Sequence, residues 1–319
     1  MIKSIFVSLL LALFSQSIAY AQQESPGIAK PAETELTAEN GKKIRIASCQ
    51  FPISSDILEN LGWIEEQITY AKLRKADIIH FPECALSGYP GVDMDSMEEF
   101  DWELLREATD SILALAKIHK KWIVLGSIHP LSQDHKPHNS LYLISPEGEI
   151  ADRYDKRFCT GSDLKFFSPG DHFVNFNVDG VNCGLLICYD IRFPELYREY
   201  RKTETDVIFQ SFYNARQGKG SIHPIIMHIT AQARAATNSF HMSLTNSSAP
   251  QSWPCYHITP DGLIRNKLEA NVPGVLISDI DLNEKFYDAS KDFRPDAING
   301  KLNSGETVSD PLSKNRQAH

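Results

Sequence analysis

Short apolar runs with strand character alternate with longer segments of helical spacing from residue 44 to about residue 280. Turn signals such as Asp179-Gly180 join some of the apolar runs directly into hairpins. Strands that alternate with helices build sheets covered by helices, so the pattern predicts an α/β fold with large mixed sheets. The pattern has no break in composition, which predicts a single domain over residues 44–299.

The boundaries follow from periodicity and turn residues. The expected helices are 57–76, 97–120, 194–202 and 223–237. The expected strands are 44–51, 77–82, 122–128, 139–145, 150–154, 172–178, 181–188, 206–212, 240–246, 255–259, 263–267 and 275–280.

Both ends of the chain differ in composition from this domain. Residues 1–21 have the features of a secretory signal peptide: Lys3, the apolar run 5–14 and the small-x-small site Ala19-Tyr20-Ala21. They predict export to the periplasm or the extracellular space, with an uncleaved membrane anchor as the alternative. Residues 22–43 are expected to be a flexible linker, and residues 300–319 a polar C-terminal tail. No later segment is apolar enough to predict a membrane span.

Charge and cysteine usage exclude several partners. The formal net charge of −9 argues against nucleic-acid binding, which needs a basic face. Of the six cysteines, Cys49, Cys183 and Cys188 lie in apolar runs, as buried free thiols do, so few or no disulfides are expected. The spacing contains no Cys-x-x-Cys pair or histidine cluster, which predicts no metal.

Three reactive side chains stand where expected strands end. Glu83 follows 77–82, Lys156 follows 150–154, and Cys188 ends 181–188. Open α/β sheets bind their ligands at the carboxyl ends of strands. A carboxylate, an ammonium and a thiol at three such ends predict one site for covalent catalysis.

The chemistry of these groups is complementary. A thiol attacks a carbonyl as the thiolate, and Lys156 would lower the pKa of Cys188. Lys156 and the backbone N–H of Tyr189 would stabilise the oxyanion, while Glu83 would act as general base and acid. Taken singly, each residue has a simpler interpretation: a core cysteine, a solvated lysine or a capping glutamate.

Three motifs around these residues resemble those of one family. They are HFPECALSGYP at residues 80–90, YDKR at 154–157 and GLLICYDIRFPE at 184–195. Residues 44–285 resemble the nitrilase superfamily of carbon–nitrogen hydrolases, in its amidase- and carbamoylase-like branch. The resemblance implies a four-layer αββα sandwich with two mixed β-sheets, a Glu83–Lys156–Cys188 triad and no cofactor. It also implies a homodimer, with helix 194–202 and strand 206–212 near the contact.

One position departs from the family pattern. Many members carry a second glutamate six residues before a Pro-Gly, and counting back from Pro169-Gly170 reaches Asp163. Asp163 would orient Lys156 and the substrate amide. The alternative is a surface loop acid, since aspartate favours turns.

The sequence after the nucleophile bears on the substrate. True nitrilases tend to have Cys-Trp-Glu, whereas this chain has Cys188-Tyr189-Asp190. The resemblance therefore favours a small-molecule linear amide or N-carbamoyl compound, cleaved through a cysteine thioester with release of ammonia or an amine. Substrate contacts are expected from Asn246, and cationic contacts from Arg192, Arg216, Lys219 and Arg234.

Other activities fit the same residues. The site would also suit nitrile hydrolysis or acyl transfer through a thioester. A pseudoenzyme that binds without turnover is a further alternative, because a fold does not fix a function. A papain-like protease would need a histidine base, and the candidates His223, His228, His241 and His257 have no recognisable flanking motif.

Overall fold

The computed structural model of the protein describes residues 42–132 and 135–317. The predicted signal peptide (1–21), and the linker (22–43) except for its last two residues, lie outside the described residues. Within the described part, no helix is long and apolar enough to cross a membrane.

The described strands form two mixed sheets of six. In the first sheet the parallel strands β1, β2 and β3 are flanked by antiparallel neighbours. Its order is β12 (Gly274–Asp281), β1 (Lys43–Gln50), β2 (Ile78–His80), β3 (Trp122–His129), β4 (His138–Ile144), β5 (Ile150–Asp155).

The second sheet repeats this plan, with the parallel strands β7, β8 and β9 inside antiparallel edges. Its order is β11 (Ile264–Lys267), β10 (Tyr256–Ile258), β9 (His241–Thr245), β8 (Val207–Ser211), β7 (Val181–Ile187), β6 (Asn175–Val178).

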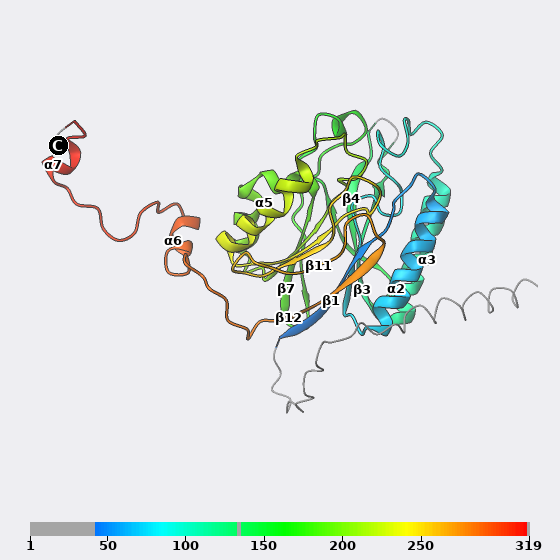
Figure 1. Cartoon of the computed structure of the whole chain (residues 1–319), viewed down its shortest axis with the longest axis horizontal. Coiled ribbons are helices and arrows are strands. Elements are labelled where there is room, and N and C mark those ends of the chain that lie inside the picture. Colours follow the sequence, from blue (N-terminus) through cyan, green and yellow to red (C-terminus); the bar gives the residue numbers. More distant parts are fainter. Residues whose placement is uncertain (1–41, 133–134, 318–319) are drawn as a thin grey trace, which may run out of the picture. The chain divides into compact units, whose positions relative to one another are not determined.

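Helices cover the outer face of each sheet. Helices α2 (Ile57–Leu73) and α3 (Trp102–His119) pack together beside the first sheet, and α4 (Pro194–Lys202) and α5 (His223–Asn238) beside the second. Figure 1 shows the strands between α2 and α3 on one side and α5 on the other. Two short helices follow, α6 (Arg294–Ile298) and α7 (Pro311–Lys314).

Side-chain alternation along the strands explains this layering. On β1, Ile44 and Ile46 belong to the core shared with the second sheet, whereas Ala47 and Cys49 belong to the core under α2 and α3. Successive strand residues point to opposite faces of the sheet. A strand with apolar side chains on both faces must therefore be covered on both sides. The expected αββα sandwich is confirmed.

Most element boundaries agree with the expected ones to within a few residues. Helix α3 begins at Trp102 rather than at residue 97, because the Asp101 side chain accepts the N–H of Leu104 at 2.9 Å and caps the helix there. Residues 300–317 of the expected polar tail are all exposed, and they include the short helix α7, which the sequence did not predict.

Candidate active site

The two sheets each contribute to one buried cluster. Glu83 follows β2 and Lys156 follows β5, both of the first sheet, whereas Cys188 follows β7 of the second sheet. Glu83 and Lys156 are completely buried, and 8% of Cys188 is exposed. The structure thus brings together the three strand ends that the sequence selected.

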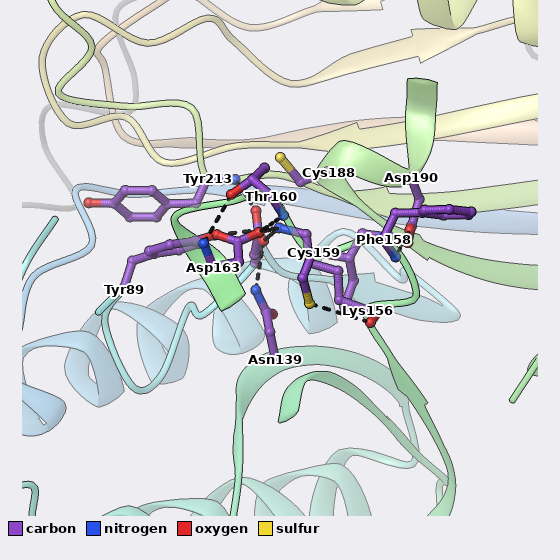
Figure 2. Close-up of polar contacts among 12 residues, drawn as sticks. Tyr89, Asn139, Lys156, Phe158, Cys159, Thr160, Asp163, Cys188, Asp190 and Tyr213 are labelled. Atoms are coloured by element: carbon purple, nitrogen blue, oxygen red, sulfur yellow. Dashed lines mark hydrogen bonds and ion pairs between the residues drawn. The ribbon is translucent and has the colours of Figure 1, made fainter. Parts of the chain in front are cut away.

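Lys156 lies at the centre of the cluster. Its Nζ donates to Glu83 Oε1 at 2.8 Å and to Asp163 Oδ2 at 2.8 Å, and it lies 3.4 Å from the Tyr89 hydroxyl. Figure 2 shows Lys156, Asp163 and Tyr89 converging, with the Cys188 side chain next to them. Burial by itself lowers the pKa of Lys156, but the surrounding acidic groups, Glu83 first, raise it well above the ordinary value. The lysine therefore stays an ammonium.

Glu83 accepts hydrogen bonds on both carboxylate oxygens. Oε1 accepts from Lys156 and from Asn139 Nδ2 at 2.8 Å, and Oε2 accepts from the backbone N–H of Tyr213 at 2.7 Å. Burial raises the pKa of Glu83 although Lys156 opposes the shift. A carboxylate whose pKa moves toward the working pH is suited to accept and return a proton.

Cys188 stands in a strained turn. Its φ is +38°, in the left-handed region that residues with a side chain rarely adopt. Asp190 fixes the turn, because its carboxylate accepts from the N–H of Ile187 at 3.0 Å, the N–H of Phe158 at 2.9 Å and the Tyr154 hydroxyl at 2.8 Å. One buried acid therefore ties the turn of the nucleophile to the segment that follows Lys156.

Burial and the charges around the sulfur favour the protonated thiol of Cys188 at rest. Burial, and next the negative charge of Glu83, raise the pKa of Cys188 well above its ordinary value, and Lys156 only partly opposes them. The expectation that Lys156 lowers the pKa of Cys188 is therefore wrong as a net effect. That expectation did not include the burial of the thiol or the charges of Glu83 and Asp163, which raise the pKa. A thiol in this setting needs a general base, and Glu83 is the adjacent one.

Asp163 belongs to the cluster. It is buried; Oδ1 accepts from the Tyr89 hydroxyl at 2.6 Å, and Oδ2 accepts from the N–H of Thr160 at 2.9 Å as well as from Lys156. Burial would raise its pKa, but Lys156 and these hydrogen bonds lower it, so Asp163 is ionised. The alternative of a surface loop acid is wrong.

Asn246 contacts the residue whose side chain approaches the Cys188 sulfur, not the sulfur itself. Its Oδ1 accepts the backbone N–H of Asn214 at 2.8 Å and its Nδ2 donates to Trp253 O at 2.9 Å, so both ends of the expected substrate ligand contact protein. The amide that approaches the sulfur is that of Asn214, with Nδ2 3.6 Å from Cys188 Sγ and Oδ1 accepting from Trp253 Nε1 at 3.2 Å. Asn246 holds the backbone of that residue.

The expected cationic contacts have different environments. Arg216 pairs with Asp93 at 2.5 Å, and the Arg234 guanidinium donates to the carbonyls of Ile191 and Arg192. Arg192 is half-buried, and its Nη2 lies 3.7 Å from Met227 Sδ. No carboxylate among the described residues forms an ion pair with Arg192. Lys219 is exposed.

Tyr189 is 36% exposed, and its ring stands edge-on to Phe193 with centroids 5.5 Å apart. The ring thus lies at the surface beside the turn of the nucleophile. The expected role of this residue concerns its backbone N–H, which follows Cys188 directly in the chain.

Sequence reasoning missed several contributing residues. Tyr89 lies inside the glutamate motif at residues 80–90, and that position was a signal that went unused. Asn139, Tyr213 and Asn214 lie at the start of β4 and just after β8, and only the packing of the strands brings them to the cluster. Strand-end position, applied to side-chain amides as well as to charged groups, would have identified Asn214.

Neither a metal site nor a disulfide occurs in the part of the chain that the structure describes. No group of three or more His, Cys, Asp or Glu side chains in the described residues could hold a metal ion. The six cysteines, which all lie in the described part, are free thiols.

The chain belongs to the carbon–nitrogen hydrolase family, whose model matches residues 45–285. Among its relatives is the 2-oxoglutaramate amidase of Bacillus subtilis, 32% identical over 140 residues, which span 43% of this chain and 52% of that protein. The omega-amidase NIT2 of Mus musculus is 27% identical over 257 residues, 75% of this chain and 89% of the relative.

Solved structures share the fold. An amidase from Nesterenkonia sp. superposes with a TM-score of 0.67 at 22% identity, covering 77% of this chain and 93% of that one. The family match over residues 45–285 identifies this protein as a carbon–nitrogen hydrolase, and the amidases are similar to it over most of the domain.

Proposed function

We propose that the protein cleaves the C–N bond of a small linear amide through a thioester on Cys188. The observation that carries the proposal is the cluster itself. A protonated thiol at the end of β7 lies beside a buried carboxylate of raised pKa, and that carboxylate is hydrogen-bonded at 2.8 Å to a permanently charged ammonium. These are the three groups that acyl transfer through sulfur requires.

Acylation begins with a proton transfer. Glu83 takes the proton of Cys188, and the thiolate attacks the amide carbon, so the carbonyl oxygen becomes an oxyanion. Lys156 Nζ and the N–H of Tyr189 donate hydrogen bonds to this oxygen. Glu83 then gives its proton to the leaving nitrogen, which departs as ammonia or an amine and leaves a thioester on Cys188.

Deacylation uses the same groups again. Glu83, now ionised, takes a proton from water, and the hydroxide attacks the thioester carbon while Lys156 and Tyr189 again stabilise the oxyanion. The carbon–sulfur bond breaks, the acid leaves, and the thiolate recovers a proton from Glu83. Asp163 helps to keep Lys156 in place, because it accepts from Nζ at 2.8 Å, the same distance as Glu83.

The substrate class follows from the relatives and from Arg192. Two relatives bear the names 2-oxoglutaramate amidase and omega-amidase. The first name denotes a primary amide whose far end is a carboxylate. In this chain Arg192, four residues after Cys188 in the turn of the nucleophile, is the half-buried cation that would bind such a carboxylate. We therefore favour short primary amides with a distal acid over N-carbamoyl compounds.

The test is a screen of ammonia release over three substrate classes. Aliphatic amides with and without a distal acid, N-carbamoyl amino acids and nitriles are compared for the wild type and for Cys188→Ala and Glu83→Gln. We expect release from amides, and its loss in both variants. Release that persists in Cys188→Ala would refute the thioester, and a preference for nitriles or carbamoyl compounds would refute the assigned substrate.

We also propose export and self-association. Export follows from the predicted signal peptide, and N-terminal sequencing of secreted protein should then begin at Gln22. For self-association, strand β8 is completely buried and offers no surface, but Ile225 and Ile229 of α5 are 63% and 54% exposed. This apolar stripe supports a homodimer through α5. Light scattering should give the mass of two chains for the wild type and of one for Ile225→Glu.

A further inference from the structure

The side chains between the two sheets change from apolar to polar toward the active site. On β1 and β2, Ile44, Ile46 and Ile78 face the second sheet, but the next positions on the same faces are Ser48 and His80. The strands β8 and β9 of the opposite sheet place hydroxyl groups against these two residues. A polar layer therefore separates the apolar core from the catalytic cluster.

His80 bridges the two sheets within this layer. It is completely buried, and its Nδ1 lies 2.8 Å from Ser243 Oγ on β9. Its Nε2 lies 2.9 Å from Ser211 Oγ on β8 and 3.3 Å from Thr245 Oγ1 on β9. The ring also stands edge-on to Phe209, with centroids 5.3 Å apart. Burial lowers the pKa of His80 to about 3, so the ring is neutral at physiological pH.

We call His80 and the hydroxyl groups of Ser48, Ser211 and Ser243 the bridge. The donor and acceptor of each hydrogen bond in the bridge follow from the contacts. Ser211 donates its one hydrogen to the carbonyl of Phe81 at 2.8 Å, so it must accept from His80 Nε2–H. A neutral ring with a proton on Nε2 accepts at Nδ1, so Ser243 donates there, and Ser48, 2.7 Å from Ser243 Oγ, donates to Ser243. The bridge is thus fully satisfied and has one orientation.

The Nε2 end of the bridge lies next to catalytic residues. Phe81 is two residues before Glu83, and Thr245 Oγ1 donates to the same Phe81 carbonyl at 3.2 Å. Ser211 is the register partner of Ile187, the residue before Cys188. Hence the bridge connects the backbone that carries the acid to the strand pair that carries the sulfur.

We propose that His80 and Ser211 are positioning residues that set the separation of the Glu83 carboxylate and the Cys188 sulfur. Apolar packing between sheets is non-directional, whereas hydrogen bonds from both nitrogens of one rigid ring fix the distance and the register of the sheets. The proposal rests on the proposed function, since it is the acid and the thiol of that mechanism whose alignment is at stake. A misplacement of about 1 Å between reacting groups can cost about 100-fold in rate.

The experiment compares four variants in the full-length protein. Ser211→Ala removes the hydrogen bonds of Ser211 to Phe81 O and to His80. His80→Phe removes the contacts of the ring with Ser211, Ser243 and Thr245 and keeps a planar ring. Ser211→Thr restores a hydroxyl. His257→Phe is the control, because the His257 ring is also buried, with Nε2 3.3 Å from His241 Nδ1, but makes no hydrogen bond to the catalytic cluster or to the bridge among the described residues. The readouts are kcat, KM and melting temperature for the amide with the fastest ammonia release.

We expect kcat to fall at least tenfold in Ser211→Ala and His80→Phe with KM changed less than threefold, and Ser211→Thr to recover most of it. The melting temperature should fall no further than in His257→Phe. A loss of kcat below threefold in Ser211→Ala, or a similar loss in His257→Phe, would overturn the proposal. If His80→Phe does not fold, Ser211→Ala decides alone.

A second readout does not depend on turnover. The charge of Glu83 raises the pKa of Cys188, so a displaced Glu83 should make the thiol react faster with iodoacetamide at neutral pH. Mass spectrometry of the peptide that contains Cys188 should show faster labelling in Ser211→Ala than in wild type or His257→Phe, and equal rates would refute the positioning role. Failure of the proposed function is seen separately, as ammonia release that survives Cys188→Ala.

Discussion

Replacing Asn139 with alanine removes one defined hydrogen bond from the catalytic acid. Its Nδ2 donates to Glu83 Oε1 at 2.8 Å inside a fully buried cluster, and the backbone carbonyl that accepts from the N–H of Lys156 is retained. A hydrogen bond to a charged group contributes about 1.5–3 kcal/mol. Because the proposed mechanism begins with Glu83 ionised, losing this hydrogen bond should lower kcat/KM by about 10- to 150-fold.

The pH dependence gives the sign of the effect. The Asn139 donor lowers the pKa of Glu83, so its removal raises that pKa. Because the mechanism begins with Glu83 ionised, the acidic limb of the kcat/KM profile should move to higher pH. The assay is ammonia release between about pH 5 and 9 for wild type and Asn139→Ala, with the profiles compared at equal enzyme concentration.

The matched control is Asn238→Ala, which removes a buried amide that donates to Arg234 O at 2.9 Å on α5. It should lose stability without moving the profile. A kcat/KM of Asn139→Ala within twofold of wild type, with an unmoved acidic limb, would show that the hydrogen bond does not act on the base.

Further predictions concern the cluster and its supports. The charge of Asp163 raises the pKa of both Glu83 and Cys188, so Asp163→Asn should move the acidic limb of the pH–rate profile to lower pH. A limb that stays or rises would contradict this electrostatic account. Asp190→Ala leaves the donors of Ile187, Phe158 and Tyr154 without their acceptor and should lower the free energy of unfolding by about 3–5 kcal/mol in urea titrations. A loss below about 1 kcal/mol would argue against the role of Asp190 in fixing the turn. A Cβ on Gly126 would lie 1.9 Å from Pro82 O, so Gly126→Ala should displace Glu83 and abolish activity; normal kcat would refute this.

Local pattern was sufficient for most strands and helices and for placing Glu83, Lys156 and Cys188 at strand ends, whereas the four-layer arrangement was predicted from the resemblance to the family. Alternating apolar runs define the strands, and charged or thiol side chains at their ends mark one edge of each sheet. The start of α3 was missed because the cap at Asp101 outweighed the apolar residues before it. Helix α7 was missed because four residues have no periodicity to detect.

The rest of the site depends on contacts between segments far apart in the chain. Asn139 is 56 residues from Glu83, and Asn214 is 26 residues from Cys188. The raised thiol pKa is also a tertiary effect, since it comes first from burial. Asn246 was expected at the substrate because it ends a strand, but a buried amide at that position has protein partners.

The most direct test of the account is the detection of the thioester. Wild-type enzyme is mixed with the best amide, quenched in acid within milliseconds to seconds, digested and analysed by mass spectrometry. The account predicts that the peptide containing Cys188 gains the mass of the acyl group and loses it on incubation at neutral pH. Turnover with no acyl group on Cys188, or with one on another residue, would contradict it.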